Sequence, residues 1–157
     1  MKNGIKLAIS VAIPVGVGVL AGFFTASGVD SWYRTIEKPS WNPPDAVFAP
    51  VWTVLYVLMG IALYHIWMSD AAPQKKRTAI LLWAIQLLFN AFWSFLFFNQ
   101  HNIGLALGEI ILLWLAILIT ILLFARVNKA AAWLMVPYIS WVSFATLLTY
   151  AIWQLNT

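Results

Sequence analysis

The chain has 157 residues, of which 63% are hydrophobic and only 9% are charged, a composition typical of an integral membrane protein. It contains no cysteine, which excludes disulfides, thiolate metal sites and cysteine nucleophiles. The net charge of +4 is too small to indicate nucleic-acid binding, and two separated histidines with five scattered acidic residues form no metal-ligand pattern. We therefore expect no metal site and no nucleic-acid partner.

Five apolar stretches each approach the roughly 20 residues that a helix needs to cross a bilayer. They lie at residues 5–27, 46–68, 78–98, 103–126 and 131–153. We therefore predict an all-α integral membrane protein, a five-transmembrane-helix bundle that forms one domain over residues 1–157. Lys2 and Lys6 lie ahead of the apolar run of the first stretch, as basic residues do in a signal peptide, but this run is longer than a typical signal-peptide core, so we expect it to be retained.

Small residues follow one face of the first predicted helix. Gly18, Gly22 and Ala26 are spaced by four, which lets another helix backbone approach closely. We interpret this face as packing inside the bundle, with a dimer interface as the alternative. Pro14 should bend the same helix, because its missing N–H interrupts the hydrogen-bond ladder.

The segment from Trp32 to Gly60 is dense in proline and tryptophan. Each proline fixes φ and removes a backbone donor, so we expect no regular helix to run through the stretch that holds Pro39, Pro43, Pro44 and Pro50. We predict a structured cap over the bundle, with a simple linker as the alternative. Pro44 and Asp45 suit a helix N-terminus and place the start of the second helix there, and Pro50 should then kink it.

Polar residues of the third predicted helix lie on one stripe. Gln86, Asn90 and Ser94 are spaced by four, and because amides at membrane depth need partners, this stripe should face the bundle interior. Glu109 is the one acidic residue inside the fourth helix, where an ionisable group is costly and often functional. We expect it to make a structural hydrogen bond, with a proton relay as the alternative.

Two helix faces combine aromatic and small side chains. In the second predicted helix, Trp52, Tyr56 and Met59 recur at helical spacing. In the fifth, one face carries Tyr138, Trp141, Ala145 and Leu148, and Pro137 should bend or restart the helix near its beginning.

The basic residues are unequally divided between the two sides of the predicted bundle. Seven lie in the N-terminus and in the second and fourth connections: Lys2, Lys6, Lys75, Lys76, Arg77, Arg126 and Lys129. Only Arg34 and Lys38 lie on the other side. The positive-inside rule then predicts a cytoplasmic N-terminus, with the first connection and the C-terminus external.

Ten tryptophans invite two interpretations. Those near the predicted helix ends are explained by the aromatic belts of membrane interfaces: Trp32, Trp41, Trp67, Trp133 and Trp153. Others lie deeper: Trp52, Trp93, Trp114 and Trp141. Indoles at this depth suit either a pocket for a flat apolar ligand or a tightly packed aromatic core, and their positions in the sequence do not separate these two possibilities.

Several separated motifs resemble one known family. W-Y-x-x-x-x-K-P-S-W-x-P-P begins at Trp32, and W-x-x-L-Y-x-x-M-G begins at Trp52. Q-L-x-x-N-x-x-W from Gln86 and P-Y-x-x-W-x-x-F-A-x-x-L from Pro137 follow in the third and fifth predicted helices. In this order they resemble the TspO/translocator protein family, the tryptophan-rich sensory proteins, over nearly the whole chain.

The resemblance implies a receptor-like membrane protein that is often a homodimer. Its members bind porphyrins and drug-like aromatic ligands in a cavity closed by the first loop, and they require no cofactor. The predicted loop contributions to binding are Tyr33, Trp41, Pro43 and Pro44. The predicted helix contributions are Trp52, Tyr56, Asn90, Trp93, Tyr138, Trp141, Ala145 and Leu148.

The resemblance also implies a chemistry. Some bacterial members degrade bound porphyrin under light through the two tryptophans that correspond to Trp52 and Trp141. The cholesterol-recognition motif of animal members ends in a basic residue, whereas here Tyr150 is followed by Ala-Ile-Trp-Gln, so we predict no sterol specificity.

Three function classes follow from these features. A sensor or scavenger would bind the tetrapyrrole, and an enzyme would turn it over through tryptophan and light, because no nucleophile or acid–base pair is evident. A transporter of tetrapyrroles or other lipophilic molecules is the alternative, although no inverted repeat supports it. We predict porphyrin binding within a prokaryotic cell membrane, with light-dependent degradation as the associated chemistry.

Overall fold

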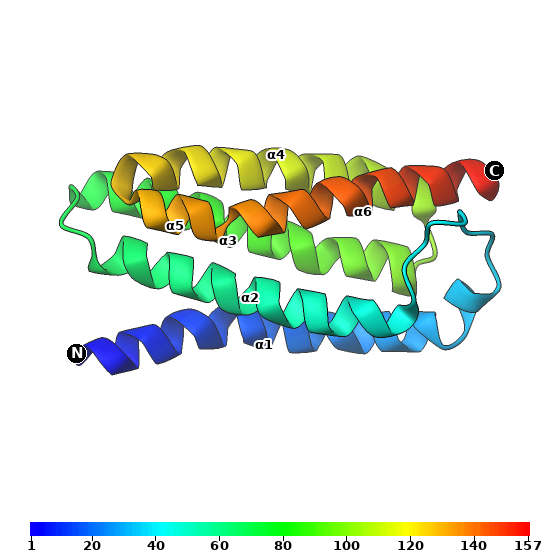
Figure 1. The fold of residues 1–157 in the computed structure, drawn as a ribbon, viewed down its shortest axis with the longest axis horizontal. Helices are drawn as coiled ribbons and strands as arrows, with labels where there is room; N and C mark the ends of the chain where they lie inside the picture. Colours follow the sequence, from blue (N-terminus) through cyan, green and yellow to red (C-terminus); the bar gives the residue numbers. More distant parts are fainter.

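The computed structural model describes residues 1–157 as a bundle of helices (Figure 1). In chain order the elements are α1 (Asn3–Val29), η1 (Trp32–Arg34), α2 (Asp45–Met68), α3 (Pro73–Ser94), η2 (Phe95–Asn99), α4 (Ile103–Val127), α5 (Lys129–Leu134) and α6 (Val136–Leu155). Five helical spans are long and apolar enough to cross a membrane, the third combining α3 with η2 and the fifth combining α5 with α6. The predicted fold class is confirmed.

Most helices are longer than the apolar stretches from which they were predicted. The third helix begins at Pro73 rather than at residue 78, and Pro73 occupies its first turn, where a missing N–H costs nothing. The second begins at Asp45, directly after Pro44, as predicted. Both α1 and α2 continue as helices through Pro14 and Pro50.

Two glycines bring α1 close to its neighbours. A Cβ added at Gly60 of α2 would lie 2.7 Å from the carbonyl oxygen of Ser10 and would also collide with the backbone of Val11. A Cβ added at Gly28 of α1 would lie 2.6 Å from the carbonyl oxygen of Phe98. The two contacts lie toward opposite ends of α1, so backbone-level packing fixes this helix against α2 at one end and against η2 at the other.

The fifth span changes direction where its helix restarts. α5 ends at Leu134, and α6 begins at Val136 with Pro137 in its first turn, which confirms the predicted restart. α5 packs closely against α2, whereas α6 packs against α4 and diverges from α2 (Figure 1). The divergence separates α2 from α6 in the half of the bundle that lies nearest the connection between α1 and α2.

A buried hydrogen-bond network ties α2, α3 and α6 together below this separation. The Tyr56 hydroxyl donates to Asn90 Oδ1 at 2.6 Å, and Asn90 Nδ2 donates to the Tyr138 hydroxyl at 2.8 Å. Tyr138 in turn donates to Gln86 Oε1 at 2.7 Å. All four side chains are buried, which confirms that the polar stripe of the third helix faces the interior.

The cation-bearing segments gather at one end of the bundle. Figure 1 shows the N-terminus, the α2–α3 connection and the start of α5 together at one end, while the C-terminus and the α1–α2 connection lie at the other. The seven basic residues of the first set are therefore close to one membrane surface, the arrangement on which the predicted cytoplasmic N-terminus depends.

Replacing Gly60 by alanine should destabilise the bundle. The new methyl group meets backbone atoms of α1 that cannot rotate away, and overpacking of this kind typically costs about 1–3 kcal/mol. Gly108→Ala in α4 is the matched control, because its Cβ would meet nothing within 4 Å and alanine favours a helix by up to about 1 kcal/mol. Thermal unfolding in detergent should give a lower Tm for Gly60→Ala only. Equal Tm values for the two variants would contradict the close α1–α2 contact.

The charge distribution predicts opposite compartments for the two termini. A reporter domain fused before Lys2 should be active in the cytoplasm, and one fused after Thr157 should be active outside, because seven of the nine basic residues lie at the N-terminal end of the bundle. Compartment-specific activity of the two fusions measures this directly. Cytoplasmic activity of the C-terminal fusion would reverse the predicted orientation.

Candidate functional site

A cavity of about 550 Å³ lies where α6 diverges from α2. It is enclosed by α1, α2, α3 with η2, and α6, and Tyr33 of η1 lies at its capped end. Of its 25 lining residues, 17 are hydrophobic. The volume falls within the roughly 300–1,000 Å³ range of small-molecule sites, and a largely apolar lining with a few polar groups is typical of them.

Three tryptophans from three helices form the aromatic part of the wall. Trp52 comes from α2, Trp93 from α3 and Trp141 from α6. Phe48 contacts Trp141 with ring centroids 6.1 Å apart, and Phe97 stacks on Trp93 at 5.1 Å. The deep tryptophans of α2, α3 and α6 therefore surround a space rather than fill it, which favours the pocket interpretation over the packed core.

Two indole groups in this wall carry donors without acceptors. The Nε1 atoms of Trp93 and Trp141 are buried and have no hydrogen-bond partner. An unpaired buried donor costs about 1–3 kcal/mol. Neither Nε1 atom is exposed to the cavity itself, so the two indoles present their ring carbons to it.

The small residues of α1 form the wall opposite these indoles. Gly18, Gly22 and Ala26 all line the cavity. Gly18 lies against the ring of Tyr56, so a side chain there would collide with it, whereas a Cβ at Gly22 would meet nothing within 4 Å. The interpretation of this face as bundle packing is therefore right only at Gly18, and further along the helix small residues leave room in the cavity. The alternative of a dimer interface stays a prediction.

The capped end of the cavity is closed by Tyr33. Its side chain is buried, and its hydroxyl donates to Asn42 Oδ1 at 2.8 Å. Lys38 Nζ donates to the Tyr33 carbonyl at 2.7 Å and lies 4.8 Å from the centroid of the Tyr33 ring. Burial raises the pKa of Tyr33 to about 12, an effect opposed by the bond to Asn42 and reinforced by Asp45. The hydroxyl is therefore protonated at neutral pH and can donate.

The rest of the cap is attached to the ends of the bundle. Asn156 accepts a hydrogen bond from the Glu37 amide at 3.0 Å and donates to the Glu37 carbonyl at 2.9 Å. Trp32 stacks on His101 with ring centroids 4.4 Å apart, and this contact joins the cap to the α3–α4 connection. Bonds and contacts to two other parts of the chain are what a structured cap requires and a simple linker lacks.

Most of the predicted ligand-binding residues meet at this cavity. Those that line it are Tyr33, Trp52, Tyr56, Trp93, Trp141, Ala145 and Leu148. Asn90 and Tyr138 lie outside the lining and hydrogen-bond to each other, and Asn90 holds the hydroxyl of Tyr56. Trp41, Pro43 and Pro44 belong to the cap without lining the cavity, and Trp41 packs its ring on Phe144 at 5.7 Å.

Some lining residues were missed in the sequence. Phe48 and Phe97 stand four residues before Trp52 and four after Trp93, so helical spacing from the recognised tryptophans was a signal for both. Asp30 and Asp45 also line the cavity, and Asp30 pairs with Arg34 at 3.4 Å on the exposed side. No sequence signal separated them from ordinary helix-end carboxylates.

The prediction for Glu109 is wrong. Its side chain is buried, but neither carboxyl oxygen has a hydrogen-bond partner within the chain. The neighbouring aromatic donor on α4, Trp114 Nε1, is instead bonded to Ser143 Oγ at 2.8 Å. The expected structural hydrogen bond is therefore absent within the chain.

These features define a class of protein: a membrane-embedded helical bundle with a capped aromatic cavity. The profile of the TspO/MBR family matches residues 10–154. The chain belongs to the TspO/MBR family and is an integral membrane protein of that family's sensor and translocator type.

Curated relatives are similar over almost their full length. The tryptophan-rich protein TspO of Chlorobaculum tepidum is 42% identical over 155 residues, which cover 99% of this chain and 98% of the relative. The tryptophan-rich protein TspO of Archaeoglobus fulgidus is 38% identical, covering 98% and 99% of the two chains. The human translocator protein is 34% identical, covering 96% and 89%.

Removing the Tyr33 hydroxyl should loosen the cap. Tyr33→Phe keeps the ring in the cavity wall and deletes the bond to Asn42, so the affinity for protoporphyrin IX should fall several-fold, the equivalent of about 1 kcal/mol for one hydrogen bond. Tyr150→Phe is the matched control, since its hydroxyl only accepts from Gln154 on the exposed side of α6. Absorbance titration of both variants measures the effect. Equal affinities of the Tyr33→Phe and Tyr150→Phe variants would mean that the cap does not contribute to ligand binding.

Proposed function

We propose that this chain binds a porphyrin or a similarly flat, apolar tetrapyrrole in the cavity between α1, α2, α3 and α6. The observation that carries the proposal is the convergence of Trp52, Trp93 and Trp141 from three helices on one apolar space. Indole faces stack favourably on flat aromatic ligands, a preference that a merely hydrophobic pocket would lack.

The unpaired donors support a ligand with acceptors. Trp93 Nε1 and Trp141 Nε1 are buried and unpartnered in the cavity wall. A tetrapyrrole carries ring nitrogens and carbonyl or carboxyl substituents that can accept from such groups. Because neither Nε1 atom is exposed to the cavity, a ligand of this class would reach these donors only if the indoles turned, whereas the aromatic contacts need no such change.

The charges of the cavity suggest how such a ligand lies. Asp30 and Asp45 lie at the capped end, and Arg34 pairs with Asp30 there. The remaining wall is apolar, so the macrocycle would occupy the depth of the cavity and its polar substituents would point toward the capped end. Carboxylate substituents of the ligand would then be attracted by Arg34 and repelled by the carboxylates of Asp30 and Asp45.

Light-dependent degradation of the bound porphyrin is the chemistry that we propose for this site. Trp52 and Trp141 flank the same space, and with no cysteine in the chain, indoles are the most readily oxidised side chains in the wall. In this proposal the photoexcited porphyrin takes an electron from an indole and passes it to dissolved dioxygen, which becomes superoxide. The oxidised indole then recovers an electron from the porphyrin. Superoxide and the porphyrin radical cation combine, so that both oxygen atoms add across one carbon–carbon bond of the macrocycle and that bond breaks to leave two carbonyl groups. No acid, base or metal of the chain is required.

Transport is the second candidate, and the name translocator protein of several relatives favours it. A transported ligand needs a route through the other half of the bundle. That half is filled by the Tyr56–Asn90–Tyr138–Gln86 network and by the indole of Trp83, which donates to the Met59 carbonyl at 3.2 Å. Binding without passage across the bundle therefore has the stronger support.

Replacing Trp52 and Trp141 by phenylalanine should separate binding from photochemistry. Phenylalanine keeps an aromatic face and removes packing area, so binding of protoporphyrin IX should weaken by about 1–3 kcal/mol. At saturating porphyrin and equal illumination, the light-driven loss of porphyrin absorbance should fall much further than the change in occupancy accounts for.

The matched control is the pair Trp133→Phe and Trp153→Phe, which removes two indoles outside the cavity lining. This control should bind and bleach porphyrin as the unmodified chain does. If the variant with phenylalanine at positions 52 and 141 degrades porphyrin as fast as the unmodified chain does at saturating porphyrin, the two tryptophans only line the cavity. The degradation proposal then fails. If the unmodified chain does not bind porphyrin saturably, the binding proposal itself fails.

A further inference from the structure

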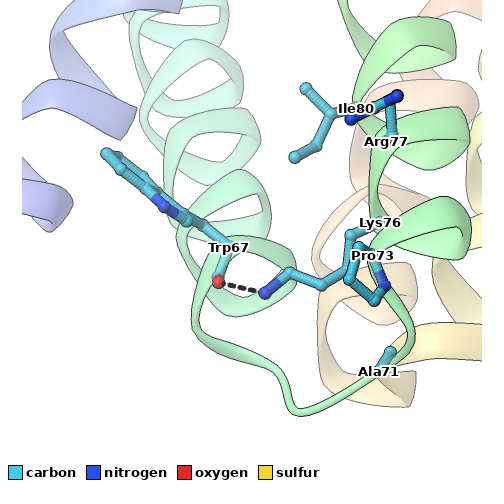
Figure 2. Close-up of a pocket in the computed structure, with 6 residues that line it drawn as sticks. All are labelled: Trp67, Ala71, Pro73, Lys76, Arg77 and Ile80. Atoms are coloured by element: carbon cyan, nitrogen blue, oxygen red, sulfur yellow. Dashed lines mark hydrogen bonds between the residues drawn. The ribbon is translucent and has the colours of Figure 1, made fainter.

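A second, smaller pocket lies at the opposite end of the bundle, between the end of α2 and the start of α3 (Figure 2). Its volume is about 430 Å³, and it is lined by Trp67, Ala71, Pro73, Lys76, Arg77 and Ile80. None of these residues lines the aromatic cavity. The pocket is open to the surroundings, and two of its six lining residues are cationic.

Lys76 is held in a fixed position in this pocket. Its Nζ atom donates to the carbonyl oxygen of Trp67 at 2.7 Å and to that of Ser69 at 2.9 Å. Figure 2 shows the side chain reaching from α3 across to the end of α2. The ammonium group therefore satisfies the last carbonyls of α2, retains its positive charge and keeps one N–H free.

Arg77 has no anionic partner in the chain. The single ion pair of the structure joins Arg34 to Asp30, at the far end of the bundle. Asp70 lies in the same connection as the pocket but forms no ion pair. The pocket thus presents an exposed guanidinium on the side of Ile80 and, separately, a fixed ammonium at the end of α2, with no carboxylate in its lining (Figure 2).

The pocket becomes apolar with depth. α3 begins at Pro73, so Ile80 lies about one helical turn further into the bundle than Lys76. Leu81 and Leu88 continue along α3 as exposed apolar side chains. On the neighbouring helix α1, Lys6 Nζ lies 5.5 Å from the centroid of the Trp67 ring, which is the pairing of tryptophan with a cation found at membrane interfaces.

We propose that this pocket binds the headgroup of an anionic phospholipid. The lipid phosphate would accept hydrogen bonds from Arg77, the positive charge of Lys76 would add attraction from the other side of the pocket, and an acyl chain would run past Ile80 along the lipid-facing side of α3. Basic pockets between transmembrane helices recognise anionic headgroups in this way. Soluble phosphate would be attracted by the same positive charges but would gain nothing from the apolar wall, so the combination favours a lipid.

The proposal is independent of the ligand in the aromatic cavity and of the function proposed for it. It does agree with the charge distribution, because the pocket lies at the end of the bundle that holds seven of the nine basic residues. That end is predicted to face the cytoplasmic leaflet, which is the leaflet enriched in anionic lipids.

The test compares two exposed arginines at this end of the bundle. Arg77→Gln removes a cation from the pocket, and Arg126→Gln removes one at the α4–α5 connection, outside it. Each protein is reconstituted in phosphatidylcholine nanodiscs containing a minor fraction of phosphatidylglycerol, and retained phosphatidylglycerol is counted by native mass spectrometry. Arg77→Gln should lower its apparent affinity about fivefold, and Arg77→Lys should restore most of it. Arg126→Gln should leave it unchanged.

Three results would overturn the proposal. Equal losses in Arg77→Gln and Arg126→Gln would mean diffuse attraction to a positive surface without a site. Unchanged retention in Arg77→Gln would mean that the pocket is not used. Displacement of the lipid by millimolar glycerol phosphate would assign the pocket to a soluble phosphate. Unaltered thermal unfolding of both variants in detergent controls for folding, which we expect because both side chains are exposed.

Discussion

The hydrogen bonds of the Asn90 side chain are the constraint on which the rest of this bundle depends. One amide accepts from Tyr56 of α2 and donates to Tyr138 of α6, so three helices must meet at one level. In a membrane, no water is available to replace a misplaced partner, and the alternative is an unsatisfied polar group in hydrocarbon. Register between α2, α3 and α6 is therefore set by polar geometry, and the surrounding apolar side chains pack around it.

The cavity follows from that meeting point together with one backbone break. Below Tyr138, the short helix α5 packs on α2, and above it α6 turns toward α4. The restart at Pro137 places the change of direction one residue before Tyr138. The hydrogen bonds of Asn90 join α2, α3 and α6 at one height in the bundle, and α2 and α6 separate beyond it. The separation leaves a space between the helices, and the large side chains of Trp52, Trp93 and Trp141 surround that space.

Much of this arrangement could be predicted from the sequence, because the signals were local. Apolar length gave the five spans, and the spacing of Gln86, Asn90 and Ser94 gave the buried polar stripe. The tryptophan and tyrosine motifs identified the residues that line the cavity on α2 and α6. These patterns succeed because each depends on the period of a single helix.

What escaped prediction depends on contacts between helices. Nothing in the spacing of Gly22 and Ala26 distinguishes a helix face that packs from one that leaves space. The third span ends in the π-helical turn η2, whose Phe97 and Phe98 line the cavity, and the apolar run there gives no sign of the wider turn. The missing partner of Glu109 is a further case, because the sequence shows that the residue lies inside a helix but does not show which side chains of other helices face it.

The helix that closes the cavity is attached differently from the three that define it. No side-chain hydrogen bond joins α1 to another helix, and its buried residues are few: Ser10, Pro14, Ala21 and Gly28. It is held by close backbone contacts at Gly28 and at Gly60 of α2, one toward each end of α1. Between these contacts it presents Gly18, Gly22 and Ala26 to the cavity. The buried hydrogen bonds of Asn90 thus fix where the aromatic groups of α2, α3 and α6 stand. The wall of α1 that faces them is held instead by close packing and by the cation–π contact between Lys6 and Trp67. Because the glycine contacts lie toward both ends of α1, this packing fixes the position of the helix without any side-chain hydrogen bond to another helix.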